Sequence, residues 1–397
     1  MQGHIHKRVH TCKNGRTSTL WYVVVDLPRG VDSKRHQKWH GGFKSRKAAE
    51  AIRARLVHEL STGFYVEPSS MLFQEWLIDY WLPVVQTRVK PTTFHAYRSC
   101  LKHHIVPNLG GIQLGRLTSQ QINGLYQRLL LDGHVKTGGA LSPASVLNIH
   151  VVIRKAMADA VDAGLIARNV AERAKPPRPQ TQSEELRYWT PPELRHFLDL
   201  IHGHRLHAAL HLLAMTGARR GEIAGLRWVD VDLDGARITI RQALNSVGGE
   251  IYVSSPKSNR GRTVDLDRRT VEVLRRHLEK QQAGGERYLN RDGGEGYVFR
   301  SIDGSRIDPR SLSTAFRWVA DQSDLPRIRL HDLRHSHASI AVKAGVPIGV
   351  ISERLGHASP EFTLHRYAHV MPGMQRDAAD RIARAVHLDD ISASPWT

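Results

Sequence analysis

Residues 331–339 read HDLRHSHAS, a polar stretch with three histidines and one arginine. Residues three apart on a helix lie on the same face. His331 and Arg334 can therefore point at one substrate group, with a proton carrier beside a fixed, permanently charged fork. A metal site built from His331, His335 and His357 is the alternative, but the acidic or thiol ligands that it would need are not clustered nearby.

Further along the chain, residues 355–369 read LGHASPEFTLHRYAH. His357 follows a glycine at a predicted helix end, and Tyr367 lies ten residues later. A single tyrosine in such a segment is normally a packing residue with a satisfied hydroxyl. The segment gains a functional meaning only together with the motifs that precede it.

Two earlier segments complete the set, TGARRGE at residues 216–222 and SPKSNRGRTVDL at residues 255–266. In the first, a Thr-Gly pair ends an apolar helix and Arg219 follows at the start of the next, where an arginine suits a phosphate. The second is a predicted hairpin with a polar turn. Its basic residues are Lys257, Arg260 and Arg262. Each segment alone is weak evidence, since surface arginines and basic hairpins are common.

The order of these motifs resembles that of the tyrosine recombinases, the phage integrase family. The chain contains the pattern TGxRxxE, a lysine hairpin, HxxR, LGH and YAH in this order. The resemblance covers about residues 70–375, which are the catalytic domain and the helical domain before it. The basic N-terminal region resembles the arm-binding domain that many members of that family carry. No expected catalytic position is missing.

The resemblance implies a nucleophile and a phosphate clamp. Carried over residue by residue, it makes Tyr367 the nucleophile, and Arg219 and Arg334 the two groups that hold the scissile phosphate. It implies that Glu222 supports these side chains from behind. Two permanently charged guanidiniums suit the negative charge that builds up when a phosphodiester is attacked.

The resemblance also implies how protons move. Lys257 is the expected general acid for the leaving 5′ oxygen, His331 assists proton transfer, and His357 donates to a non-bridging oxygen. Enough fixed positive charge is present that no metal ion or other cofactor is expected. Further DNA contacts are expected from Arg260, Arg262, Lys44, Arg46 and Lys47.

The composition supports a polyanionic partner. Lys and Arg number 57 against 38 Asp and Glu, so the formal net charge is +19, and 41% of the residues are hydrophobic. That apolar fraction excludes a disordered or fibrous chain. The charge favours nucleic acid, with an anionic membrane surface as the weaker alternative.

Nearly half of the excess charge lies in residues 1–65, which carry 13 Lys and Arg but only 4 Asp and Glu. Strands are predicted over Leu20–Leu27 and near Gln37–Phe43, and a helix over Lys47–Leu60 with Ser45 as its cap. We interpret this region as a strand-plus-helix, arm-type DNA-binding domain; a small domain with a solvated basic face is the alternative.

The remaining chain is predicted to be mainly helical, with small β elements. Residues 66–174 are expected to form a four-helix core-binding domain, and residues 175–187, which contain three prolines, a linker. Residues 188–390 are expected to form a mixed α/β catalytic domain, with a last amphipathic helix over about 373–388 that docks in cis or on a neighbouring subunit. Residues 391–397 are a tail. Strands are predicted over Arg237–Arg241, Ile251–Ser254 and Arg262–Leu266.

Cysteine usage and hydropathy exclude several protein classes. The two cysteines, Cys12 and Cys100, exclude a disulfide scaffold and a four-cysteine zinc site. The N-terminus lacks the apolar stretch of a signal peptide, and no run of 18 apolar residues occurs. We expect a cytoplasmic, nucleoid-associated protein without membrane contact.

These features predict an integrase that cleaves and rejoins DNA through a covalent 3′-phosphotyrosine and integrates or excises a phage or mobile element. Double-stranded DNA with core and arm sites is the expected partner, bound by a tetramer on two paired sites. A host DNA-bending protein and an excision factor are further candidate partners. The alternatives are a chromosome-dimer or transposon resolvase, a type IB topoisomerase, and a catalytically inactive DNA-binding regulator.

Overall fold

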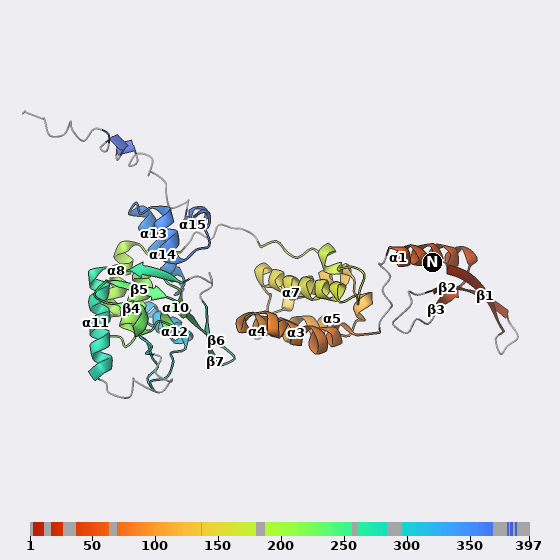
Figure 1. Cartoon of the computed structure of the whole chain (residues 1–397), viewed down its shortest axis with the longest axis horizontal. Coiled ribbons are helices and arrows are strands. Elements are labelled where there is room, and N and C mark those ends of the chain that lie inside the picture. Colours follow the sequence, from red (N-terminus) through yellow and green to blue (C-terminus); the bar gives the residue numbers. More distant parts are fainter. Residues whose placement is uncertain are drawn as a thin grey trace, which may run out of the picture. The chain divides into compact units, whose positions relative to one another are not determined.

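The computed structural model describes residues 3–11, 17–26, 37–62, 70–135, 137–179, 187–255, 261–283 and 296–367, and a few residues between 379 and 386. The chain divides into two compact units, residues 1–180 and 181–397 (Figure 1). In the described part of the chain, no helix is both long and apolar enough to span a lipid bilayer.

The chain begins with an antiparallel three-stranded sheet that carries one helix. The elements are β1 (Gly3–Thr11), β2 (Thr17–Asp26), β3 (Gln37–Phe43) and α1 (Arg46–Ser61), with the strands in the order β1-β2-β3. The Ser45 hydroxyl caps α1 by accepting a hydrogen bond from Ala48 N at 3.2 Å. The predicted strand-plus-helix module is confirmed. The sequence does not predict β1, because residues 4–10 (HIHKRVH) contain little apolar surface.

Alternation along the strands divides the sheet into two faces. Ile5, Val23 and Val25 point toward α1 and pack with Ala49 and Leu56. The opposite face is left without a covering helix among the described residues of this module (Figure 1).

The next domain consists of four helical segments. The first is α2 (Phe73–Glu75), η1 (Trp76–Trp81) and α3 (Leu82–Arg88), and the second is α4 (Pro91–Cys100), η2 (Leu101–Ile105) and α5 (Val106–Leu109). The third and fourth are α6 (Ser119–Asp132) and α7 (Pro143–Asp162), with short turns η3 (Leu114–Arg116) and η4 (Val170–Arg173) beside them. This confirms the four-helix prediction.

Each of the first two segments continues through a proline. η1 and η2 are π-helical, and each is followed at once by a segment whose second residue is proline, Pro83 or Pro107. Proline has no N–H, and its ring collides with the carbonyl four residues earlier in a regular α-helix. The wider π turn relieves both problems and lets the helix continue.

Polar pairs connect the helices inside this otherwise apolar core. Trp76 Nε1 donates to the carbonyl oxygen of Ala156 at 3.0 Å. The Tyr126 hydroxyl on α6 and His150 Nδ1 on α7 form a buried hydrogen bond of 2.6 Å. Buried polar atoms are thus satisfied without water.

The second unit contains helices around a small sheet, as the mixed α/β prediction requires. Its helices are α8 (Pro191–Leu200), α9 (His207–Thr216), α10 (Arg220–Ala224), η5 (Trp228–Asp230), α11 (Arg268–Ala283), α12 (Pro309–Asp321), α13 (Asp332–Lys343), α14 (Ile348–Leu355) and α15 (Pro360–Tyr367). One sheet has the order β4 (Val231–Asp232), β5 (Arg237–Ile240), β8 (Arg262–Asp265), and β6 (Ala243–Val247) pairs with β7 (Glu250–Ser254). Strands β4 and β6 add to those predicted.

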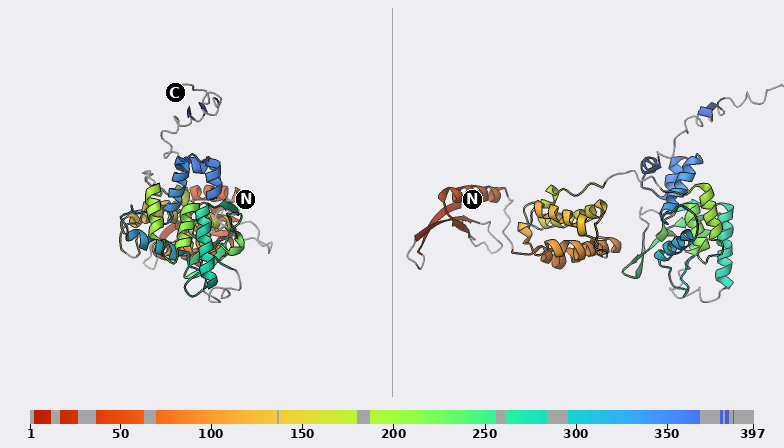
Figure 2. Two further views of the ribbon diagram at one scale, coloured as in Figure 1. Left: turned by 90° about the vertical axis from the view of Figure 1, so that its left-hand side faces the viewer. Right: turned by 180° about the vertical axis from the view of Figure 1, so that it is seen from behind.

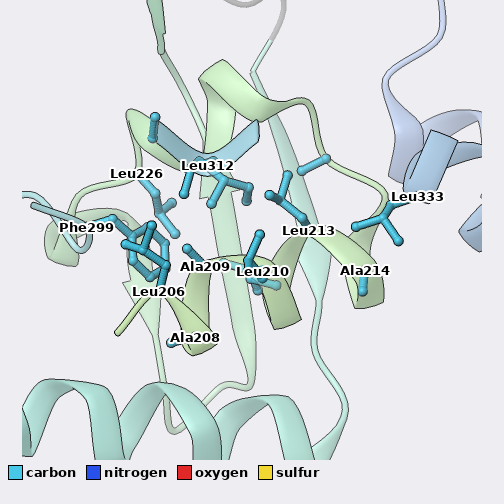
Figure 3. Packing of buried hydrophobic residues seen from close by; sticks show 14 of the residues in the cluster. Leu206, Ala208, Ala209, Leu210, Leu213, Ala214, Leu226, Phe299, Leu312 and Leu333 are labelled. Atoms are coloured by element: carbon cyan, nitrogen blue, oxygen red, sulfur yellow. The ribbon is translucent and has the colours of Figure 1, made fainter. Parts of the chain in front are cut away.

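Helix α9 forms the centre of this unit (Figure 3). All but two of its ten residues are buried, as expected of a helix that is apolar on every side. Leu210 and Leu213 pack with Leu226 and Leu312 in one continuous core. The C-terminal end of α9 is therefore a rigid support for the residues that follow it.

Helices α13, α14 and α15 lie side by side at one end of the unit (Figures 1 and 2). α13 also packs on α9, and α14 packs on β8. Their shared core includes Val342, Ile351, Leu355 and Tyr367. The predicted helix over residues 373–388 falls mostly outside the described residues.

Candidate active site

The turn between α9 and α10 positions the first arginine. Gly217 ends α9 in the left-handed region, with φ of +63°. A Cβ on Gly217 would lie 2.6 Å from Leu355 Cδ2 and 2.9 Å from the His337 ring, so only glycine fits. Arg219 follows as the cap of α10, and its backbone N donates to Glu222 Oε2 at 2.9 Å. The predicted helix end and helix start are both confirmed.

Glu222 lies behind this turn and joins two arginines. Its side chain is 1% exposed. Arg219 Nη1 donates to its Oε1 at 2.9 Å, and Arg262 Nη1 and Nη2 donate at 3.1 and 2.7 Å. Burial alone raises the pKa of Glu222, but the hydrogen bonds and charges of Arg262 and Arg219 outweigh burial and hold the pKa below its ordinary value. The carboxylate therefore stays ionised and fixes both guanidiniums.

Arg262 does not lie on the surface where the sequence analysis placed it. Its side chain is 6% exposed, and Nε donates to the Arg354 carbonyl oxygen at 2.8 Å while both Nη atoms bind Glu222. All its nitrogens are thus used inside the protein. The expected DNA contact is replaced by a structural role, because the alternation of β8 turns this residue toward α14. Lys257 and Arg260 lie outside the described residues.

Arg334 is the second arginine of the site, and part of it has no partner. Its Nη1 donates to the Gly217 carbonyl oxygen at 2.8 Å, whereas its Nη2 is buried without a hydrogen-bond partner. Burial, followed by the charge of Arg219, lowers the pKa of Arg334 to about 9, so that it remains charged at neutral pH. A buried cationic donor without a partner is costly unless an anion completes it.

A cavity of about 380 Å³ opens beside these arginines, and Arg219, His331 and Arg334 line it. His331 directly precedes α13, the helix that carries Arg334. Desolvation by the surrounding atoms, and then the charge of Arg334, lower the pKa of His331. A neutral imidazole thus stands beside two positive charges.

His357 lies after α14, where Gly356 ends the helix with φ of +66°. Its Nδ1 pairs with Thr363 Oγ1 at 2.7 Å. Burial, followed by the charges of Arg334 and Arg219, lowers the pKa of His357 to about 3. If Nδ1 accepts from the threonine hydroxyl, Nε2 carries the proton of the neutral ring and is a donor.

Tyr367 ends α15, and its side chain is fully buried. Its hydroxyl forms a hydrogen bond of 2.8 Å with Nδ1 of His335 on α13. Burial raises the pKa of Tyr367 to about 12, against the opposing charge of Arg334. Burial, followed by His331, lowers the pKa of His335 to about 4, so that this imidazole is neutral.

The structure thus gathers most of the predicted site residues. The set comprises Arg219, Glu222, His331, Arg334, His357 and Tyr367. Arg334 is close enough to Arg219, Glu222 and Tyr367 for their charges to act on it. Sequence reasoning considered His335 only as a ligand in the alternative metal site, although its position one residue after Arg334 and four after His331 was the available signal.

Among the described residues, no three His, Cys, Asp or Glu side chains are grouped so that they could hold a metal ion. His331 and His335 contact each other edge to face, with ring centroids 5.4 Å apart. The predicted basic contacts Lys44, Arg46 and Lys47 lie at the start of α1, and Arg46 forms an exposed ion pair with Glu50 at 3.0 Å.

The open face of the N-terminal sheet carries cationic and aromatic side chains. The Arg8 guanidinium lies 4.7 Å from the Trp39 ring centre and 5.5 Å from that of Tyr22. His6 stacks on Trp39, with centroids 5.0 Å apart. A Cβ on Gly41 would collide with the Tyr22 ring, so this ring lies directly against β3 at Gly41. Trp39 is 44% exposed, so this face offers aromatic and cationic groups to a partner.

Three family models match this chain. Residues 187–373 match the phage integrase family, residues 72–130 match the N-terminal SAM-like domain of phage integrases, and residues 10–60 match an arm DNA-binding domain. Together the matches extend over both compact units.

Individual relatives agree with these matches. A tyrosine recombinase XerC-like protein of Caldanaerobacter subterraneus subsp. tengcongensis is 27% identical over 395 residues, covering 95% of this chain and 98% of that protein. The structure of the Tn1549 transposon integrase (residues 82–397) with transposon right end DNA has a TM-score of 0.64 at 19% identity, covering 79% of this chain and all of that one. A lambda integrase tetramer bound to a Holliday junction has a TM-score of 0.55 at 20% identity, covering 89% and 96%. At these identities the two structures show a shared fold.

Proposed function

This chain belongs to the phage integrase family of tyrosine recombinases, which cleave and rejoin DNA at specific sites, and we propose that Tyr367 is the nucleophile with which it does so. The observation that carries this assignment is the buried Nη2 of Arg334, which lacks a partner, in a guanidinium whose charge acts on Tyr367. A phosphodiester oxygen is an anionic acceptor that completes it. Attack by Tyr367 then forms a 3′-phosphotyrosine.

The two arginines hold the phosphate. Arg219 and Arg334 face one cavity and present permanent charges to the non-bridging oxygens. Neutral His357 donates to the same oxygens through Nε2. Glu222 and Arg262 are positioning residues that fix Arg219 from behind. Since these charges are in place before the reaction, little reorganisation is needed in the transition state.

The leaving 5′ oxygen needs a proton as its bond to phosphorus breaks. We assign this proton to Lys257, with His331 assisting from the rim of the cavity. The bond energy of the phosphodiester is kept in the phosphotyrosine. A 5′ hydroxyl of another strand can therefore attack it and release Tyr367 without a nucleotide cofactor or metal ion.

The N-terminal module supports an integrase rather than a resolvase. Residues 10–60 match an arm DNA-binding domain, and the open sheet face presents Arg8, Tyr22 and Trp39. We propose that this face binds arm sites, with Lys44, Arg46 and Lys47 contacting phosphates, while the other domains bind core sites. Binding should weaken steeply with salt, because each neutralised phosphate releases counterions.

The proposed activity also implies how the chain assembles and which partners it needs. The lambda integrase structure is a tetramer bound to a Holliday junction, and we propose a tetramer on two paired sites for this chain. A host bending protein and an excision factor fit a chain that must bridge core and arm sites. The proposed domains are residues 1–65, 66–174 and 188–390, and the proposed place of action is the cytoplasmic nucleoid.

A covalent trap tests the proposal. Nicked duplex DNA carrying the core attachment site is incubated with the full chain in EDTA and separated on a denaturing gel. The expected result is a protein–DNA band that Tyr367→Phe abolishes while DNA binding persists. Binding of the true site without any covalent band would instead favour the inactive DNA-binding regulator.

A further inference from the structure

The hydroxyl of Tyr367 has a partner that the proposed mechanism does not yet use. His335 Nδ1 lies 2.8 Å from it, and the two side chains come from different helices, α13 and α15. His335 is 8% exposed and Tyr367 is fully buried. The imidazole is therefore placed on the reacting oxygen itself, and bulk water does not compete for that contact.

His331 and His335 lie one helical turn apart but face different places. His331 lines the cavity with Arg219 and Arg334. His335 is not part of that lining and instead contacts the tyrosine ring and hydroxyl. The two histidines thus serve different places: His331 lines the cavity, and His335 contacts the Tyr367 hydroxyl.

The geometry points to His335 as the group that accepts the proton of the Tyr367 hydroxyl when this oxygen attacks phosphorus. This inference rests on the proposed role of Tyr367. As the Tyr367 Oη–P bond forms, the P–O5′ bond breaks, the hydroxyl proton passes to His335 Nδ1, and the 5′ oxygen takes a proton from the opposite side. In the rejoining step a 5′ hydroxyl attacks and gives its proton to the group that served as general acid, the Oη–P bond breaks, and His335 returns its proton to Tyr367.

The surroundings of His335 suit this cycle. The ring is neutral at rest and so is able to accept a proton. The charged and titratable groups that face it are His331 just before α13, Asp332 and Arg334 on α13, and Arg366 on α15, with His357 close by. The cations among them disfavour a protonated His335 in the free protein. An incoming phosphate adds negative charge beside the ring and so stabilises the imidazolium while the bond forms.

The chain offers a matched control. Tyr126 and His150 form the same hydroxyl-to-Nδ1 hydrogen bond, 2.6 Å long, in the helical domain. His150→Asn removes the same type of ring from a buried pair that has no phosphate to serve. Effects of losing a buried tyrosine–histidine bond in general can therefore be separated from effects on the reaction.

The test compares His335→Ala, His335→Asn and His150→Asn in single-turnover cleavage of the nicked core-site duplex. The asparagine amide oxygen replaces Nδ1 as a hydrogen-bond acceptor but takes no proton. We expect both His335 variants to cleave at least about 100-fold more slowly with unchanged DNA affinity, and His150→Asn to cleave within about twofold of the unmodified chain. If His335→Ala does not fold, the cleavage rate of His335→Asn still tests the inference, because this variant retains the hydrogen bond to Tyr367.

Two measurements separate removal of the Tyr367 proton from protonation of the leaving 5′ oxygen. Without His335 the tyrosine must lose its proton to hydroxide, so the variants should gain about tenfold in rate per pH unit over a range where the unmodified chain is flat. A 5′-bridging phosphorothiolate leaves as a thiolate that needs no proton. It should therefore rescue Lys257→Ala, which lacks the proposed general acid, and leave the His335 variants slow.

Four results would overturn the inference: a His335→Asn rate equal to that of the unmodified chain, faster cleavage by either variant, an unchanged pH profile, or rescue by the phosphorothiolate. Faster cleavage would identify the contact as a restraint on Tyr367. A covalent product from Tyr367→Phe would instead refute the proposed nucleophile, so the two failures are distinguishable.

Discussion

Two buried tyrosine–histidine pairs occur in this molecule, one in each compact unit. Tyr126 and His150 connect α6 to α7 inside an apolar core, and Tyr367 and His335 connect α15 to α13. Both hydroxyls meet Nδ1 of a ring whose pKa is lowered by burial. The local geometry of the two pairs is nearly the same.

The difference lies in what stands next to each pair. Beside His150 the nearby charge is the exposed Arg154. Beside Tyr367 stands Arg334, which is buried and has one nitrogen without a partner. A buried tyrosine hydroxyl therefore becomes a candidate nucleophile because an unsatisfied cation lies next to it. Its hydrogen bond to a histidine does not distinguish it from a purely structural tyrosine.

The largest effect is expected when the hydroxyl of each tyrosine is removed in turn. Tyr367→Phe should lower covalent product below detection in the EDTA trap, because no other oxygen replaces the nucleophile. Tyr126→Phe should form product at the unmodified rate. Loss of product in both variants would show that the comparison fails and that any buried hydroxyl of this kind disturbs the site indirectly.

The next largest effect on cleavage is expected when the arginine beside each pair is removed. Arg334→Ala should slow cleavage by about 10²–10³-fold or more, as the loss of one preorganised donor to an oxyanion does. Arg154→Ala should leave the rate within about twofold. Arg334→Lys tests the fork, since an ammonium cannot bind both Gly217 O and a phosphate in the same plane. A lysine variant as fast as the unmodified chain would contradict the bidentate clamp.

The sequence predicts one member of this comparison and misses the other. The motif order singles out Tyr367 and Arg334, because the residues that carry chemistry recur at recognisable spacings. Tyr126 and His150 are 24 residues apart on two helices, and nothing in either segment marks a buried pair. His335 is missed for the same reason, since the contact that defines it depends on how α15 packs against α13.

Arg262 shows where sequence reasoning misleads. A basic hairpin predicts solvent exposure, but period-two alternation along β8 places Arg262 on the inner side together with Val264. The acidic residue that receives it, Glu222, lies 40 positions earlier. The continuation of two helices through Pro83 and Pro107 could not be predicted from the sequence, because a π turn leaves no clear sequence signature.

A smaller effect concerns the carboxylate behind the arginines. Glu222→Ala should lower the free energy of unfolding by about 3–5 kcal/mol, because it leaves the buried Arg262 without its counter-ion. Glu272→Gln, which removes an exposed ion pair with Arg276 on α11, should change it by less than about 1 kcal/mol. Denaturant unfolding of the full chain measures both. Equal effects would show that Glu222 is not the support of the site.

The same carboxylate predicts a pH dependence of stability. Its pKa is lower in the folded protein than in the unfolded chain. Its contribution is therefore present above its unfolded pKa of about 4.3 and is lost as the pH falls through the folded value. Melting temperatures between pH 3 and 7 should fall less steeply in acid for Glu222→Gln than for the unmodified chain. Parallel curves would contradict this.

The smallest effect returns to the two hydroxyls and concerns stability alone. Tyr126→Phe leaves His150 without its partner, and a lost neutral hydrogen bond costs about 1 kcal/mol. Native-state hydrogen exchange of the full chain should show faster exchange in α6 and α7 but unchanged exchange in α13 and α15, with the reverse pattern for Tyr367→Phe. One possible result is that the two variants lose similar local stability while only Tyr367→Phe loses cleavage. That result would show that the two pairs stabilise the structure alike and differ only in the reaction. A cost confined to Tyr126→Phe would mean that the Tyr367 contact contributes nothing to folding and is kept for the reaction.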